Sequence, residues 1–97
     1  MNTYIVLRRQ AWGSGEELAE TAERSRRIGA EMGGRVRWIR SYVVEDSGDS
    51  LATACVYQAS SEEDLREHAR RVGMPASEVL PVVDAVIVND DPPPASA

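Results

Sequence analysis

The sequence predicts an α+β fold in which two helices cover one face of a four-stranded antiparallel sheet. Four segments have the alternation or the β-branched content of strands, and the two segments between them carry apolar residues at helical spacing. Their order along the chain, β-α-β-β-α-β, is that of the ferredoxin-like fold. The chain has 97 residues, which suits one domain. We place this domain at residues 1–88 and expect the Pro-rich tail over 89–97 to be disordered.

The first strand and the first helix are predicted within residues 4–34. Tyr4–Arg8 is a short run of β-forming residues, and a Gly-Ser-Gly sequence ends it. Ser14 stands three residues before Glu17, which is the spacing of a capping box at the start of a helix. Small and apolar residues then recur at helical spacing: Leu18, Ala22, Ser25, Gly29 and Met32. A glycine pair ends this helix.

Residues 35–59 predict an antiparallel hairpin. Arg35–Glu45 is the strongest strand, turn-forming residues follow at 46–49, and Leu51–Ala59 returns as the next strand. Strict alternation along the first of these strands puts five side chains on one face: Val36, Trp38, Arg40, Tyr42 and Val44. By the same rule, Cys55 and Tyr57 share one face of the second strand.

The second helix and the last strand complete the pattern. Ser60 and Glu63 have the spacing of another capping box, and Gly73 followed by Pro75 ends the helix that it begins. Four residues share one face of this helix: Leu65, His68, Ala69 and Val72. Leu80–Val88 is almost continuously apolar and predicts the last strand.

The second face of the sheet also needs a cover. Two helices can cover one face only, yet Leu80–Val88 and the strand around Trp38 are apolar in both directions. The simplest cover is another copy of the chain, sheet against sheet, as in dimeric α/β barrels. We therefore expect a homodimer.

Composition excludes several classes of protein. All 11 basic residues are arginines, so neither Schiff-base chemistry nor a P-loop, which both need lysine, is available. One His and one Cys cannot form a His₂, His₃ or Cys₄ metal site within one protomer. A net charge of −5 argues against nucleic acid as a partner, and no apolar stretch approaches a membrane span. A lone Cys suits the reducing cytoplasm, and abundant Arg and Ala without Lys or Phe are typical of a GC-rich bacterial genome.

A few side chains could carry chemistry. His68 has an ordinary pKa that suits acid–base catalysis, although a packed and hydrogen-bonded core histidine is the alternative. Arg40 could stabilise an oxyanion, and Tyr42 could orient the substrate with it. Candidate substrate-binding residues are Trp38, Tyr57, Cys55 and Met74. For each of these four, a purely structural role in the core is the alternative.

Three segments resemble a family of small bacterial proteins that are usually labelled nickel-binding proteins or a domain of unknown function. The segments are Trp38–Asp46, Cys55–Ala59 and Arg66–Pro75, within a match over residues 36–88. The resemblance implies a ferredoxin-like fold, a dimer and nickel as a possible ligand. Members of this family often carry His where this chain has Arg40. A protonated guanidinium cannot bind a metal, so only His68 and Cys55 remain as ligands at matching positions.

Two functional hypotheses follow. The first is a metal-free, cofactor-independent enzyme of the cyclase, isomerase or monooxygenase type, acting on a small polyketide-like or aromatic substrate. Its catalytic residues would be His68, Arg40 and Tyr42, in a cleft between the sheet and the second helix. The alternative is a nickel-binding protein that uses His68 and Cys55. A purely structural partner domain, without a pocket, is the third reading.

Overall fold

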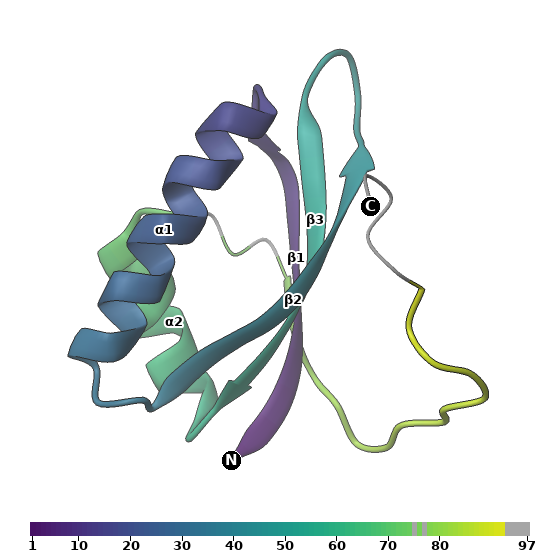
Figure 1. Ribbon diagram of the computed structural model, residues 1–97. Helices are drawn as coiled ribbons and strands as arrows, with labels where there is room; N and C mark the ends of the chain where they lie inside the picture. Colours follow the sequence, from purple (N-terminus) through teal and green to yellow (C-terminus); the bar gives the residue numbers. More distant parts are fainter. Residues whose placement is uncertain (75, 77, 93–97) are drawn as a thin grey trace.

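The computed structural model describes residues 1–92 apart from residues 75 and 77, and it confirms the predicted fold class. The elements in chain order are β1 (Asn2–Trp12), α1 (Gly15–Glu31), β2 (Val36–Glu45), β3 (Leu51–Ala59), α2 (Glu62–Val72) and β4 (Glu78–Pro81). The strands form one four-stranded antiparallel sheet in the order β2-β3-β1-β4. Both helices lie on the same side of this sheet (Figure 1). Neither helix is long and apolar enough to cross a membrane.

The core lies between the sheet and the helices. Strand β1 sends alternate side chains into it, and Tyr4, Val6 and Arg8 are all buried. Strand β3 continues the same layer, with Tyr57 opposite Tyr4 and Cys55 opposite Val6. The apolar face of α2 closes this layer from the helix side.

Both helices begin at serine caps, one of them a residue later than the sequence predicts. Ser14 caps α1 as predicted, and its hydroxyl accepts a backbone hydrogen bond at 3.1 Å. In α2 the cap is Ser61, which accepts from the backbone N–H of Asp64, whereas the sequence pointed to Ser60. Ser60 belongs instead to the end of the sheet, because its N–H donates to the carbonyl of Arg35.

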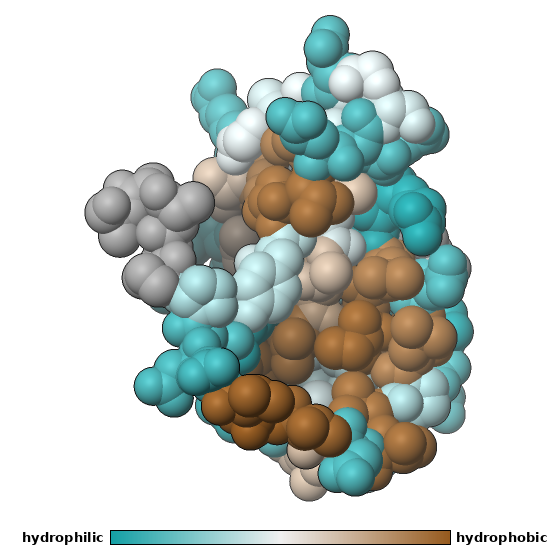
Figure 2. Space-filling view, turned by 90° about the vertical axis from the view of Figure 1, so that its right-hand side faces the viewer, coloured by the Kyte–Doolittle hydropathy of each residue, from teal (hydrophilic) through white to brown (hydrophobic). Residues whose placement is uncertain are grey.

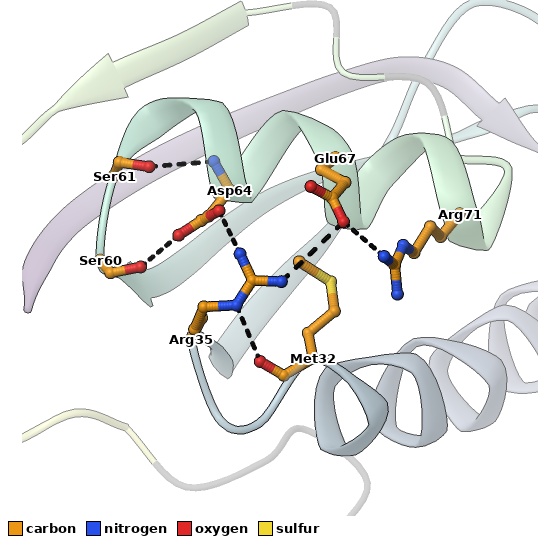
Figure 3. Close-up of polar contacts among 7 residues, drawn as sticks. All are labelled: Met32, Arg35, Ser60, Ser61, Asp64, Glu67 and Arg71. Carbon is orange, nitrogen blue, oxygen red and sulfur yellow. Dashed lines mark hydrogen bonds and ion pairs between the residues drawn. The ribbon is translucent and has the colours of Figure 1, made fainter.

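Arg35 connects the loop after α1 to the start of α2 through ion pairs and hydrogen bonds (Figure 3). Its Nη1 lies 2.5 Å from Asp64 Oδ1, and its Nη2 lies 3.9 Å from Glu67 Oε2. Its Nε donates a hydrogen bond to the carbonyl of Met32 at 3.0 Å. Glu67 also pairs with Arg71 one turn further along α2, at 2.6 Å. These contacts hold the end of α1 and the first residues of β2 against α2.

A β-bulge at Ile39 changes the faces predicted for β2. Trp38 lies opposite Tyr57, and the next pair joins Arg40 to Val56, so Ile39 is an extra residue between them. Trp38 therefore faces the helices, as Tyr57 does. The opposite face carries three of the side chains that the sequence placed beside Trp38: Arg40, Tyr42 and Val44. The predicted common face is wrong because a period of two residues contains no signal for a single inserted residue.

The last strand is shorter than the apolar run that predicted it. β4 ends at Pro81, whereas the sequence predicted a strand over Leu80–Val88. β4 runs antiparallel to β1 toward its first residue, and after one more hydrogen bond, from Val82 N to Thr3 O at 2.9 Å, the chain leaves the sheet (Figure 1). Four apolar residues beyond this point are 82–96% exposed: Val83, Val86, Ile87 and Val88. Residues 93–97 of the predicted tail lie outside the described residues.

The face of the sheet away from the helices is rich in apolar side chains. Figure 2 looks at this side of the molecule and shows apolar residues gathered across it. Three of them are half-buried, namely Ile5, Leu7 and Val56. Three more are 44–49% exposed, namely Tyr42, Val44 and Leu80. We call these six residues the open face.

Candidate functional site

A groove of about 490 Å³ lies between α1 and β2. The wall from α1 consists of small residues and one arginine, namely Ala22, Ser25, Arg26, Gly29 and Ala30. The opposite wall consists of Gly34 and residues 36–41, and α2 contributes His68 alone. The cleft predicted between the sheet and the second helix is thus displaced to the first helix. The reason is packing, because small side chains on α1 leave space while the larger Leu65 and Val72 of α2 are buried.

His68 lines the groove although it is almost completely buried. Its side chain is 1% exposed, and its Nε2 lies 3.0 Å from the carbonyl oxygen of Ser25. A carbonyl only accepts hydrogen bonds, so in the neutral ring Nε2 carries the proton and Nδ1 is an acceptor. Among the described residues, Nδ1 has no hydrogen-bond partner. Burial lowers the pKa of His68, the Ser25 carbonyl opposes this, and the charge of Arg8 adds to the lowering.

Gly29 is what allows α1 to approach this histidine. A Cβ at this position would lie 3.3 Å from the carbonyl oxygen of Val36 and 3.8 Å from His68 Nε2. The first distance is tighter than an ordinary carbon–oxygen contact, so a larger residue would push α1 away from β2. The small residue predicted at this helical position therefore sets the width of the groove.

Trp38 links the groove to the core. Its ring stacks on Tyr57, with centroids 5.6 Å apart and an angle of 12° between the planes. Its Nε1 donates to Ser41 Oγ at 2.6 Å, and this hydroxyl in turn donates to Cys55 Sγ at 2.9 Å. Because Trp38 and Ser41 both line the groove, these contacts run from its wall into the buried layer.

Arg8 lies at the inner end of these contacts. Its side chain is fully buried, its Nη1 donates to Cys55 Sγ at 3.2 Å, and its guanidinium carbon lies 5.4 Å from the centre of the Tyr57 ring. Neither its Nε nor its Nη2 has a hydrogen-bond partner among residues 1–74, 76 and 78–92, and the same holds for the Tyr57 hydroxyl. Arg8 was not singled out from the sequence. Its period-two spacing from Tyr4 and Val6 was the signal that could have found it.

The environment of Tyr57 keeps its hydroxyl protonated. Burial raises the pKa of Tyr57 to about 12, and the positive charge of Arg8 opposes this increase. Ser25 and Arg8 lie near enough to the hydroxyl to lower its pKa, although neither has hydrogen-bonding geometry toward it. Tyr57 also meets the ring of His68 edge-on, at 6.0 Å between centroids. Arg8, Tyr57 and His68 therefore form a buried polar cluster behind the groove.

Three other residues that the sequence suggested for the site lie apart from this cluster, namely Arg40, Tyr42 and Met74. Arg40 lines the groove but pairs with Asp91, and the Tyr42 hydroxyl donates to the same carboxylate at 3.0 Å. Both contacts lie on the side of the sheet away from the helices, where Arg40 also borders a second cavity of about 400 Å³ with residues 86–91. Met74 is buried with Trp12 in a separate apolar cluster. The groove thus brings together His68 and Trp38, with Tyr57 and Cys55 behind its wall. Arg40 borders the groove, but its charged group lies with Tyr42 on the other face of the sheet, and Met74 lies apart from both.

Comparison with known proteins places the chain in a family. Residues 4–82 match the family model described as "Nickel responsive protein SCO4226-like". The chain belongs to this family. Its fold is similar to that of a solved structure titled "Crystal structure analysis of SCO4226 from Streptomyces coelicolor A3(2)", with a TM-score of 0.70 and 18% sequence identity, over 87% of this chain and 99% of that chain. No curated protein matches the chain.

The SCO4226-like description directs attention to metal donors. Over the part of the chain that the structure describes, no group of three or more His, Cys, Asp or Glu residues could hold a metal ion. The two donors expected from the sequence are also poorly suited. Cys55 Sγ receives a hydrogen bond from the Arg8 guanidinium, whose positive charge opposes a second cation beside it, and His68 Nε2 is occupied by Ser25. The described donors of one protomer therefore do not fit a nickel ion.

Proposed function

We propose that the groove between α1 and β2 binds a small, flat organic molecule. One observation carries the proposal: a concave pocket, with small residues along its α1 wall, includes Ser25, Ser41 and His68 in its lining. Its volume of about 490 Å³ is ordinary for a small-molecule site, and Trp38 supplies an aromatic surface in its wall. No metal takes part in this proposal.

The chemistry within the groove centres on His68. Its lowered pKa keeps the ring neutral near pH 7, and Nδ1 is a buried acceptor without a hydrogen-bond partner among the described residues. Tyr42 lies outside the groove and Arg40 is paired with Asp91, so neither supports the acid–base step that the sequence assigned to them jointly with His68. We propose binding as the function, with His68 as the group that would exchange a proton with the ligand.

A pair of variants on α1 tests the site. Ala22 lines the groove, whereas Ala19 is exposed on the same helix and does not line it. Titration with 2-naphthamide, followed by NMR chemical shifts, should move the signals of Trp38 and Ser41. Ala22→Leu fills the groove and should abolish the shifts, whereas Ala19→Leu should leave them unchanged. Shifts that persist in Ala22→Leu, or that never occur, would overturn the proposal.

Nickel binding is the second candidate, and the family description is the observation that favours it. The described residues of one protomer do not provide enough side chains to bind a metal ion, so such a site would need residues from more than one chain. Titration calorimetry with Ni²⁺ separates the candidates. The groove proposal expects no heat beyond that of the buffer. Binding at one equivalent or less per protomer, lost in His68→Gln, would support nickel instead.

We also propose that the protein is a homodimer joined through the open face. The exposed apolar side chains of Val44 and Leu80, together with the apolar segment 83–88, form a surface that a soluble monomer rarely leaves uncovered. Light scattering should give twice the chain mass of 10.6 kDa at micromolar concentration. Val44→Glu should release the monomer, whereas Ala19→Glu on the helix side should not. A wild-type monomer would exclude this interface. The free thiol of Cys55 supports a reducing compartment such as the cytoplasm.

A further inference from the structure

The segment that follows β4 has the composition of a strand but does not form one. Residues 83–88 consist of four valine or isoleucine residues, which favour strands, together with one aspartate and one alanine. They pair with no strand in the part of the chain that the structure describes. The side chains of Val83, Val86, Ile87 and Val88 are 82–96% exposed. Burying them would release free energy, so the segment is suited to contact another surface.

The same segment is attached to the sheet at both of its ends. At its start, the N–H of Val82 donates to a carbonyl of β1 at 2.9 Å. At its end, Asp91 pairs with Arg40 of β2 and accepts a hydrogen bond from the Tyr42 hydroxyl, also of β2, at 3.0 Å. Strand β3 separates β1 from β2, so residues 83–91 cross the sheet on the side away from the helices (Figure 1). We call residues 83–91 the arch.

The arch does not cover the sheet that it crosses. A cavity of about 400 Å³ is lined by Arg40 and by residues 86–91 of the arch. On the open face, Leu80 and Val44 remain 45% and 49% exposed, and the apolar side chains of the arch are exposed as well. One chain therefore carries two apolar surfaces on the same side of the sheet without bringing them together.

A second copy of the chain supplies what each of these surfaces lacks. Around a two-fold axis, the arch of each copy can lie on the open face of the other, which covers both kinds of surface in both copies. The charges agree with this arrangement, because Asp91 is acidic and Arg40 of β2 is basic. The contact that these two groups make within one chain can form between chains with the same groups. Exchange of the arches thus adds apolar burial and keeps the ion pair.

We propose that the two copies of the homodimer exchange their arches. The arch of one copy covers the open face of its partner, and its Asp91 binds the partner's Arg40 and the partner's Tyr42. This inference rests on the proposed homodimer and assigns the segment that joins the two chains. In the alternative, each arch stays on its own chain, and the two arrangements differ in which chain supplies the carboxylate to Arg40.

Charge-reversed variants distinguish the two arrangements. Arg40→Glu and Asp91→Arg each place like charges at this contact, and both positions are half-exposed, so the fold should tolerate them. We expect each variant alone to dimerise roughly tenfold more weakly than the wild type in sedimentation equilibrium. An equimolar mixture of the two should regain most of this loss, because in the heterodimer each exchanged arch meets an opposite charge. Arches that stay on their own chains would keep like charges together in every mixture.

Two further variants complete the test. Asp90→Arg makes the same charge change one residue earlier in the arch, and with Arg40→Glu it should form weaker heterodimers than Asp91→Arg does. Ile87→Glu places a charge among the apolar side chains of the arch and should also weaken the dimer, whereas Ala19→Glu on α1 should not. If the Arg40→Glu and Asp91→Arg mixture dimerises no better than its components, exchange is excluded and the homodimer stands. A wild-type monomer would overturn both proposals.

Discussion

The guanidinium of Arg8 donates a hydrogen bond from Nη1 to the thiol sulfur of Cys55 at 3.2 Å, and both side chains are fully buried. A thiol is a weak acceptor, so this contact does not offset the loss of hydration of a charged group. The ring of Tyr57 provides the other described contact of the guanidinium. The fold thus retains a charge in its core that lowers its stability, and the same charge lies directly behind the groove.

Replacing Arg8 with an apolar residue of similar length should therefore stabilise the protein. We expect Arg8→Met to raise the free energy of unfolding by about 1–4 kcal/mol, because a buried charge is exchanged for a packed side chain. Urea denaturation followed by circular dichroism measures this change. Arg8→Lys keeps the charge but loses the planar group above Tyr57, and should be less stable than the wild type. A clear loss of stability in Arg8→Met would show that the guanidinium is better satisfied than its described contacts indicate.

His68 should make stability depend on pH on the acid side of neutrality. Its pKa in the folded protein lies below the ordinary value of 6.5, mainly because of burial, so the unfolded chain takes up the proton first. Stability should be full above about pH 6.5 and should fall as the pH drops from there toward the folded pKa. The chain has one histidine, so urea denaturation between pH 7 and pH 5 isolates this effect. His68→Gln should show a flatter profile, and an unchanged slope in that variant would contradict the assignment.

Tyr57 should make the stability of the protein depend on pH on the alkaline side of neutrality. Burial raises its pKa to about 12, whereas an unfolded tyrosine titrates near 10, so the unfolded chain loses the proton first. The stability that depends on the neutral phenol is present below pH 10. It is lost as the pH rises toward 12, by roughly 2–3 kcal/mol. The chain contains no lysine, which simplifies this range. Tyr57→Phe should weaken the dependence measured by urea denaturation at pH 9 and 11, while Tyr42→Phe should leave it as in the wild type.

Arg35 should stabilise the corner that carries the groove. It joins Asp64, Glu67 and the carbonyl of Met32, as Figure 3 shows, and its network is only partly exposed. We expect Arg35→Gln to lower the free energy of unfolding by about 1 kcal/mol, with a smaller effect at high salt. The matched control is Arg66→Gln, which breaks an exposed helical pair with Glu62 and should cost about 0.3–0.5 kcal/mol. Equal losses in both variants would show that the corner network adds nothing beyond an ordinary surface pair.

The limits of the sequence are visible at particular residues. The order of strands and helices along the chain followed from periodicity, and the cap of α1 was found at Ser14. Ser60 was one residue from the true cap, Ser61, because two adjacent serines offer the same capping chemistry. The bulge at Ile39 separated Trp38 from Arg40, since pairing with β3 and not local composition determines where a residue is inserted.

The candidate site was likewise predicted only in part from the sequence. Local pattern identified His68 as an inward-facing residue and showed that lysine chemistry and a one-chain His or Cys metal site were excluded. It placed the cleft beside the wrong helix, because the width of a groove depends on how the small residues of α1 meet β2. It also did not detect Arg8 as a core residue, since composition treats a charged side chain as exposed.

The sequence alone determined the fold class, the family and the small set of groups that can carry chemistry, because alternation, helical spacing and residue identity are local properties. Only the tertiary structure decided which of these groups meet. The burial of Arg8 behind Cys55, the groove along α1 and the separation of Tyr42 from His68 all depend on strand pairing and on packing between distant segments. Such contacts depend on the mutual fit of distant surfaces, which no local pattern of residues records.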